Sequence, residues 1–213
     1  MKKILAGACL FGLLLSACTP AAEPGDDGTL HILATTYPVY LFTTAVTEGA
    51  EDVEVSLLVN QPTSCLHDYT LTVSDMRAIE KADVLVMNGA GLEDFMDDAL
   101  ATSNAAVIDC DQGVDLLPAL NSHDVEEDHA HDAHDHDHED HDHGDIDPHY
   151  WMDPRRAVQM MENLADGLSQ ADPAHAQDYA RAAQSCTAQL SGWEEELNDL
   201  FDSARRQEVD FSG

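Results

Sequence analysis

The sequence contains a dense run of histidine and acidic side chains between positions 122 and 148. Its histidines are His123, His129, His131, His134, His136, His138, His141 and His143. Imidazole has a reference pKa of ~6.5, so above neutral pH it is mostly uncharged and free to coordinate a metal ion. It suits zinc, copper, nickel and iron, and the interleaved carboxylates add oxygen ligands. The tract therefore predicts low-affinity binding of several divalent ions; the simpler alternative is an acidic, solubilising linker.

Two histidines outside the tract have surroundings that could fix them in place, as a selective metal site with three or four ligands requires. His67 lies in a loop that leaves the end of a predicted strand, and His149 follows the tract between proline and aromatic residues. Each is a candidate ligand of a primary site, the alternative being a structural or surface histidine. Cys65 offers a soft donor beside His67, although a buried or free thiol is the simpler interpretation. We expect His31 to be a packed or edge residue and His175 a surface residue.

The chain is strongly acidic, because 42 Asp and Glu against 9 Lys and Arg give its 213 residues a formal net charge of −33. Binding of nucleic acid needs Lys and Arg to neutralise phosphates, so we expect no nucleic-acid partner. The same charge excludes electrostatic attachment to anionic lipids. The hydrophobic fraction of 44% is ordinary, which leaves enough apolar residues for a core.

The first 17 residues have the layout of a secretory signal, in which Lys2 and Lys3 precede a short apolar run. This run is too short for a membrane-spanning helix, which needs ~20 residues. The letters LSAC that end at Cys18 resemble a bacterial lipobox, where the cysteine becomes the lipidated first residue. We therefore predict a lipoprotein signal over 1–17 and a tether over 18–29; an ordinary signal cut beside a cysteine is the alternative.

Three cysteines remain after the signal and Cys18 are set aside. They are Cys65, Cys110 and Cys186. An odd number in an exported chain means that at least one has no internal partner. The sequence therefore predicts no disulfide framework.

Strand and helix patterns alternate over residues 30–121, which predicts an α/β lobe with a parallel sheet and helical crossovers. Thr72 followed by Asp75 is typical of a capping box at a helix start. Ligands of such sheets gather at the carboxyl ends of the strands, and the loop over 60–71 leaves one of these ends. The predicted strands are 30–36, 53–59, 83–87 and 105–108, and the predicted helices are 37–48, 72–81 and 92–101.

Residues 122–148 contain few large apolar side chains, so they cannot bury enough surface to offset the entropy of ordering. We predict that they form a disordered metal-binding loop. Residues 149–172 should then complete the lobe, with a helix from about Pro154 to Ser169.

A long helix is predicted over 173–206, because apolar or small residues recur every three or four positions from Tyr179 to Ala204. A helix of ~30 residues would be ~45 Å long. That length fits a strut between two lobes, and a plain core helix fits the pattern equally well. Residues 207–213 would then begin a further lobe.

Four segments together resemble the zinc-uptake solute-binding proteins of ABC transporters, the ZnuA-type members of the metal-binding cluster A-I group. They are QPTSCLHDYTLTVSD at 61–75, NGAGL at 88–92, the histidine-rich tract, and DPHYWMDP at 147–154. The resemblance extends over residues 30–206. The tract is similar to the His-rich loop of zinc members, which manganese members generally lack, so the resemblance implies Zn²⁺ rather than Mn²⁺.

This resemblance implies two α/β lobes joined by one long, rigid helix, with the metal in the cleft between them. His67 and His149 fall on the two ligands of the first lobe, and residues 173–206 on the linking helix. Some zinc members carry a carboxylate before the first histidine, where this sequence has Leu66. The second lobe, with a third histidine and an acidic ligand, has no counterpart here. We therefore expect a truncated chain, the alternative being that Cys65, the tract or a second copy completes the site.

By resemblance, the chain is the extracytoplasmic solute-binding component of an ABC-type importer, anchored to the bacterial cell membrane by a lipid on Cys18. It would capture Zn²⁺ as a monomer, deliver it to a membrane permease, and not act as an enzyme. A zinc-buffering or storage lipoprotein acting through its loop is the alternative. A metallohydrolase is disfavoured, because catalytic zinc normally has three protein ligands and only two are found. Imidazoles must lose protons to bind metal, so capture should weaken in acid.

Overall fold

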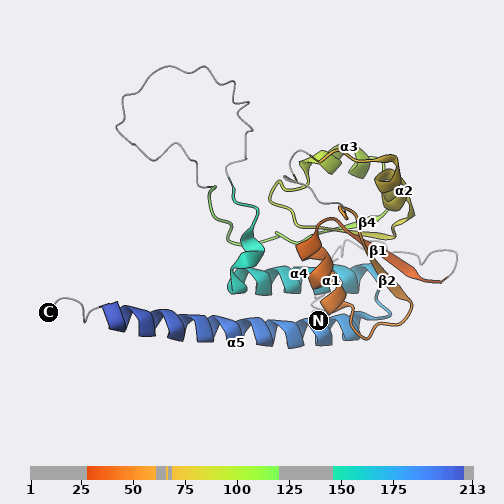
Figure 1. The fold of residues 1–213 in the computed structure, drawn as a ribbon. Helices are drawn as coiled ribbons and strands as arrows, with labels where there is room; N and C mark the ends of the chain where they lie inside the picture. The colour runs from red at the N-terminus through yellow and green to blue at the C-terminus, as the bar shows by residue number, and fades with distance from the viewer. Residues whose placement is uncertain (1–27, 61–65, 67–68, 120–145, 209–213) are drawn as a thin grey trace, which may run out of the picture.

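A parallel four-stranded sheet forms the centre of the computed structural model, which describes residues 28–60, 66, 69–119 and 146–208 (Figure 1). The strand order is β2-β1-β3-β4, and every neighbouring pair is parallel. Ala34, the last residue of β1, lies opposite Leu57 of β2 and Val86 of β3. The predicted fold class is therefore confirmed. The strands are β1 (Leu30–Ala34), β2 (Val53–Leu57), β3 (Val84–Met87) and β4 (Ala106–Asp109).

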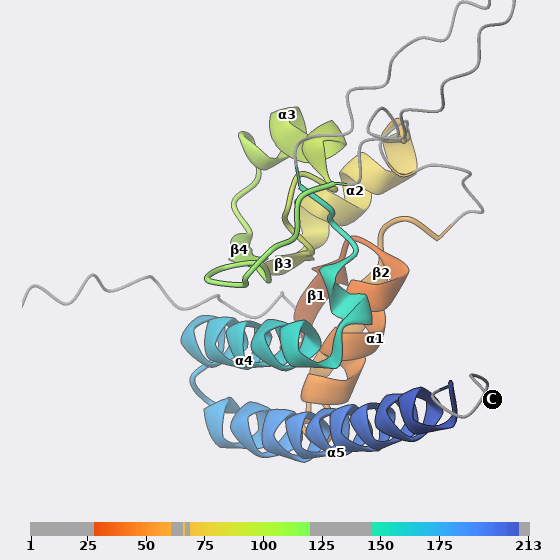
Figure 2. The same ribbon diagram turned by 90° about the vertical axis from the view of Figure 1, so that its left-hand side faces the viewer.

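Helices cover both faces of this sheet. The α-helices are α1 (Tyr37–Val46), α2 (Val73–Lys81), α3 (Asp97–Leu100), α4 (Pro154–Ala171) and α5 (Ala176–Glu208), and the short 3₁₀ turns are η1 (Asp94–Met96) and η2 (Tyr150–Met152). Helices α1 and α4 lie on one face with α5 outside them, whereas α2 and α3 lie on the other (Figures 1 and 2). At the start of α2, Thr72 and Asp75 form the predicted capping box.

Alternation along the strands divides the core between the two faces, as the period of two in a strand requires. Ile32 and Ala34 of β1 belong to the cluster that packs on α1, α4 and α5, and Leu33 belongs to the cluster on α2 and α3. Helix α4 approaches the sheet very closely at Gly167, where an added Cβ would lie 2.7 Å from an Ile108 side-chain carbon. The sheet is thus held between two helical layers, and its carboxyl-end loops project from a packed scaffold.

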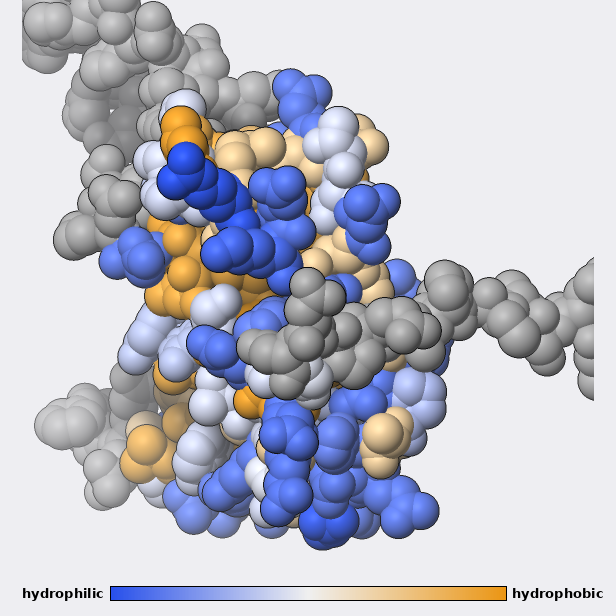
Figure 3. Space-filling model, turned by 90° about the vertical axis from the view of Figure 1, so that its right-hand side faces the viewer, coloured by the Kyte–Doolittle hydropathy of each residue, from blue (hydrophilic) through white to orange (hydrophobic). Residues whose placement is uncertain are grey.

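Helix α5 has 33 residues and packs over only part of its length. Tyr179 and Ala183 are buried against the core, whereas Trp193 and Leu200 are 56% and 62% exposed. Figure 1 shows the helix continuing past α4. The first half of α5 is therefore a core helix, and the second half is not. On the face seen in Figure 3, the surface of the α4 and α5 layer is largely hydrophilic. Within the described residues, none of the helices has an apolar stretch long enough to cross a membrane.

One expectation from the sequence is wrong. The helix expected over 92–101 is instead a turn followed by η1 and α3, because Ala90 and Gly91 adopt positive φ and the Glu93 side chain turns inward. The side chain of His175 is partly exposed, at 27%, and its Nδ1 lies 2.7 Å from Asp172 Oδ2. The same carboxylate oxygen accepts the hydroxyl of buried Tyr179 at 2.6 Å, which ties the turn before α5 to the core.

Candidate metal centre

His149 is oriented by the carboxylate two residues before it. Its Nδ1 lies 2.7 Å from Asp147 Oδ1, and its backbone N–H donates to the same oxygen at 2.9 Å. These two bonds hold the pKa of the Asp147 carboxyl below its usual range, so the group is ionised and can only accept. The proton of the neutral imidazole therefore sits on Nδ1, which leaves the lone pair on Nε2.

The His149 ring is presented to solvent rather than packed away. Its side chain is 55% exposed, and its centroid lies 5.2 Å from that of Trp151. None of the described residues forms a hydrogen bond with Nε2. A carboxylate on one ring nitrogen and an open second nitrogen is the usual arrangement of a metal-ligating histidine.

The segment that carries His149 is attached to the carboxyl end of β3 through one residue, Asn88. The Asn88 Nδ2 donates to the Pro148 carbonyl at 3.1 Å, and the Asn88 carbonyl accepts the Tyr150 hydroxyl at 2.6 Å. All three residues are buried. The residues on both sides of His149 are thus bound to a single point of the sheet.

Asn88 is itself held by a buried carboxylate, Glu93, whose residue is 2% exposed. Glu93 Oε1 accepts the Asn88 N–H at 2.8 Å and the Thr35 hydroxyl at 2.6 Å, and Oε2 accepts the Gly89 N–H at 3.1 Å. Burial raises the pKa of Glu93 to about 7, against the effect of these bonds and with a contribution from the charge of Asp109. Glu93 therefore links the ends of β1 and β3 beneath the His149 segment.

Two further carboxylates support the turn after β3. Asp111 Oδ2 accepts the Ala90 N–H at 2.6 Å, and the Asp111 N–H donates to Asp109 Oδ1 at 3.2 Å. Burial and the charge of Asp111 raise the pKa of Asp109. Gly89 has φ +78°, and a Cβ there would overlap both carboxylates, so only glycine fits.

His67 lies outside the described residues, as does the neighbouring Cys65, but the residues that flank them are fixed. The Tyr69 N–H donates to the Leu66 carbonyl at 3.0 Å, and both side chains pack against the cluster under α2 and α3. The Tyr69 hydroxyl donates to Asp75 Oδ2 at 3.0 Å. Upstream, Val59 N–H donates to the Thr35 carbonyl at 3.1 Å, so both ends of the loop begin at the carboxyl edge of the sheet.

The remaining predicted site residues also lie outside the part of the chain that the structure describes. They are Cys18 and the tract histidines His123, His129, His131, His134, His136, His138, His141 and His143. The ends of the tract are described: Pro118 and Ile146 form an antiparallel bridge, and the Asp147 N–H donates to the Leu117 carbonyl at 2.9 Å. Among the described residues, no three His, Cys, Asp or Glu side chains come together to hold a metal ion.

The other histidines and cysteines of the described chain have structural places. His31 is partly exposed in the inner strand β1, where its Nδ1 lies 3.6 Å from Glu54 Oε2 on β2, as a packed strand residue does. Cys110 is buried and Cys186 partly buried, and both are free thiols. Burial, followed by the charges of nearby carboxylates, raises the pKa of Cys110, so it is not poised to bind metal.

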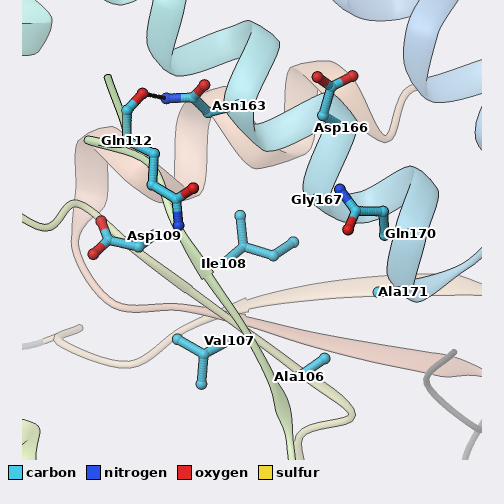
Figure 4. Close-up of a pocket in the computed structure, with 10 residues that line it drawn as sticks. All are labelled: Ala106, Val107, Ile108, Asp109, Gln112, Asn163, Asp166, Gly167, Gln170 and Ala171. Carbon is cyan, nitrogen blue, oxygen red and sulfur yellow. Dashed lines mark hydrogen bonds between the residues drawn. The ribbon is translucent and has the colours of Figure 1, made fainter. Parts of the chain in front are cut away.

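A separate groove of about 310 Å³ runs between β4 and α4 (Figure 4). Its polar side chains include Asp109, Gln112, Asp166 and Gln170. The Asn163 Nδ2 donates to the Gln112 carbonyl at 2.8 Å and so ties the helix to the chain after β4. This groove lies along the strand and not at the loop that carries His149, and it brings no histidine into reach.

Reasoning from the sequence named His149 but not the residues that hold it. Asn88 and Glu93 are 60 or so positions away in the chain, and only the fold brings them beneath the segment. The signal that could have found Asn88 is its place directly after a buried strand, before a glycine. Asp147 belongs to the DPHYWMDP segment, and its place two residues before His149 is the local signal that its carboxylate could accept from the ring.

Comparisons with known proteins place the chain in a family. Residues 32–211 match the family model described as ZnuA, zinc-uptake complex component A periplasmic. The chain is 29% identical over 214 residues to the zinc-binding protein AdcA of Streptococcus pyogenes, covering 97% of this chain and 40% of that protein. It is 29% identical over 197 residues to the high-affinity zinc uptake system protein ZnuA of Bacillus subtilis, covering 89% and 57%.

The structures lead to the same family. The fold is similar to that of the crystal structure of Zn(II)-bound AdcA from Streptococcus pneumoniae, with a TM-score of 0.63, 25% identity, and coverage of 79% of this chain and 32% of that one. The chain thus spans about two fifths to three fifths of the length of the curated relatives it matches. The family model covers β1 from residue 32, the other three strands, all the described helices and the His149 segment. The chain belongs to the ZnuA family, the periplasmic component A of zinc-uptake complexes.

Proposed function

We propose that this chain is a metal-binding lobe of the solute-binding component of an ABC-type importer, which captures Zn²⁺ outside the cytoplasm and presents it to a membrane permease. The observation that carries the proposal is the geometry of His149, whose Nδ1 is fixed by Asp147 while Nε2 faces solvent. Zinc prefers neutral imidazole nitrogen as a ligand. Membership of the ZnuA family and the names of the two zinc-binding relatives support the choice of Zn²⁺ over Mn²⁺.

The primary site, in this proposal, uses His149 and His67. Both loops start from the carboxyl edge of the sheet, where ligands of parallel α/β folds bind. Two histidines can hold one Zn²⁺ with water in its remaining positions, so this chain alone should show a single site, and protein ligands from a second lobe would tighten that site further. Helix α5 then serves as the linking helix, and its exposed residues Trp193 and Leu200 are where a second lobe would pack.

The remaining parts of the chain follow from the same proposal. Residues 1–17 direct export, a lipid on Cys18 anchors the mature protein to the membrane, and residues 18–29 form the tether. The histidine-rich loop over 122–148 collects Zn²⁺ at low affinity beside the primary site. The protein works as a monomeric solute-binding protein and not as an enzyme. The alternative function is zinc buffering by the loop alone, which the density of histidine and acidic residues favours.

A competition titration with a chromophoric chelator separates these two functions. The samples are the chain from Cys18 onward, a copy that lacks Ser122–Asp145, His149→Ala, and the control His31→Gln. A single tight site that survives the deletion and is lost in His149→Ala supports the receptor. Weak, multiple binding that disappears with the tract supports the buffer and contradicts the receptor. His31 lies near the amino end of β1, so its variant should bind as the parent does.

A further inference from the structure

We propose that Asn88 and Glu93 are positioning residues of the metal site. They hold the backbone on both sides of His149 and so set the direction in which its Nε2 lone pair points. The inference rests on the proposed function and deepens it, because it assigns the residues that prepare the ligand before the ion arrives. Neither residue touches the metal in this proposal. Glu93 fixes the turn after β3, and Asn88 holds the two neighbours of His149.

The first argument is that Asn88 holds the His149 segment at two points. Its Nδ2 bonds to the carbonyl of Pro148, and its own carbonyl bonds to the hydroxyl of Tyr150. A single bond would let the segment pivot, whereas two bonds that bracket His149 fix its rotation as well as its position. Ligands need such support, because a site that is slightly too loose loses most of its affinity.

The second argument is that the Asn88 amide can adopt only one orientation. Its Nδ2 donates to the carbonyls of Gly89 and Pro148, and neither of these oxygens could accept from Oδ1. Within the described residues, the buried Asn88 Oδ1 has no hydrogen-bond partner, and neither has the buried Thr36 Oγ1. A buried amide that leaves one oxygen unpaired has a free-energy cost, which is typical of residues kept for a function rather than for stability.

The third argument concerns Glu93, a buried carboxylate whose partners are hydrogen-bond donors. None of the Lys, Arg or His residues in the described chain forms an ion pair with it. Burying a carboxylate without a cation is costly, and three donors offset only part of that cost here. Two of those donors are the backbone N–H groups of Asn88 and Gly89, so the group acts on the turn that presents Asn88.

The isosteric variant Asn88→Asp tests the proposal, because the lost hydrogen bond and the added charge should change Zn²⁺ affinity in opposite directions. It replaces both Nδ2 donors by an acceptor, which breaks the bond to Pro148 and repels that carbonyl. It also adds a negative charge near the metal, which by electrostatics alone would tighten the binding of a cation. If positioning dominates, Zn²⁺ affinity falls by roughly 10–100-fold, the range measured for residues that orient metal ligands.

The experiment compares the wild-type chain with Asn88→Asp, Glu93→Gln and the control Asp172→Ala. Three quantities are measured: Zn²⁺ affinity of the tightest site by chelator competition, hydrogen exchange of backbone amides over 147–153, and stability in urea. The control removes a partly buried carboxylate at the turn before α5, so it should lower stability without changing affinity or local exchange. Asn88→Asp and Glu93→Gln should lower affinity and speed exchange over 147–153 specifically.

Each outcome decides between the two proposals. If the wild-type chain has no saturable Zn²⁺ site, the proposed function fails, whatever the variants do. If the site is present and Asn88→Asp leaves its affinity unchanged or tighter, the positioning role is wrong and the function stands. A loss of affinity in Asp172→Ala equal to that in Asn88→Asp would also overturn the positioning role, because the effect would then follow from stability alone.

Discussion

Glu93 makes the stability of this protein depend on pH in a way that one substitution can isolate. Its pKa is raised to about 7 in the folded state, from a reference value of 4.5. Between these two values the folded chain keeps a proton that the unfolded chain has lost. Stability therefore falls as pH rises through this window, is unaffected by this group below about 4.5, and is constant again above about 7.

The size of the effect follows from the shift. Each unit of pKa difference is worth about 1.4 kcal/mol, so the group should lower the free energy of unfolding by about 3 kcal/mol across the window. Because Glu93 is almost fully buried, solvent screening reduces this figure little. Glutamine has nearly the same shape and does not titrate, so Glu93→Gln removes the pH-dependent part while other groups titrate as before.

The assay is urea unfolding of both proteins at about pH 4, 5, 6, 7 and 8, without metal. The stability of the wild type minus that of Glu93→Gln should fall by about 3 kcal/mol from the lowest pH to the highest. Exposed histidines contribute equally to both proteins and cancel in the difference. A difference that stays constant within about 1 kcal/mol would mean that the three hydrogen bonds fully offset the burial of this carboxylate, and the reasoning would be wrong.

Three further predictions concern other parts of the described chain. Asp147→Ala should weaken Zn²⁺ binding by roughly 10–100-fold in a chelator titration, because the His149 ring loses its orienting partner, whereas removing the exposed charge in Glu195→Ala should change nothing. Gly167→Ala should lower stability in urea by about 1–3 kcal/mol, since its Cβ meets a β4 side chain at 2.7 Å. Gly192 has open space around it, so Gly192→Ala should raise stability by roughly 1 kcal/mol. Equal effects of Gly167→Ala and Gly192→Ala on stability would contradict the packing of α4 against the sheet. Asp172→Ala should cost about 1–3 kcal/mol, because a buried tyrosine hydroxyl loses its acceptor; a smaller loss would show that water replaces the carboxylate.

The alternation of strands and helices could be predicted from the sequence because its signals are local. The apolar runs at β1 and β3, the capping box at Thr72 and the long periodic stripe of α5 each depend on neighbouring residues. The helix expected over 92–101 failed for the opposite reason. Glu93 has a good intrinsic helix propensity, but its carboxylate is needed by donors on Thr35, just after β1, and on the turn after β3.

The candidate site divides in the same way. A histidine between a proline and aromatic residues, after a polar tract, can be noticed in one sequence, and His149 has the geometry that a ligand needs. Its support by Asn88 could not be predicted, because the two are joined only through the closed sheet. His67 lies outside the described residues, so its role as a ligand stays a prediction. The contacts of His175 could not be predicted either, because nothing local shows that Asp172 also accepts the hydroxyl of Tyr179.

The bridge between Pro118 and Ile146 fixes both ends of the histidine-rich tract beside each other, a few residues before His149. Whatever path residues 119–145 take, at ~3.5 Å per residue none of them can lie more than ~50 Å from that bridge. Eight imidazoles within ~50 Å of one point have an effective concentration of roughly 25 mM, however dilute the protein is. In the proposed receptor, an ion released by one imidazole of the tract has others close by to rebind it, so the time it spends near His149 should rise with the number of histidines as well as with the affinity of each.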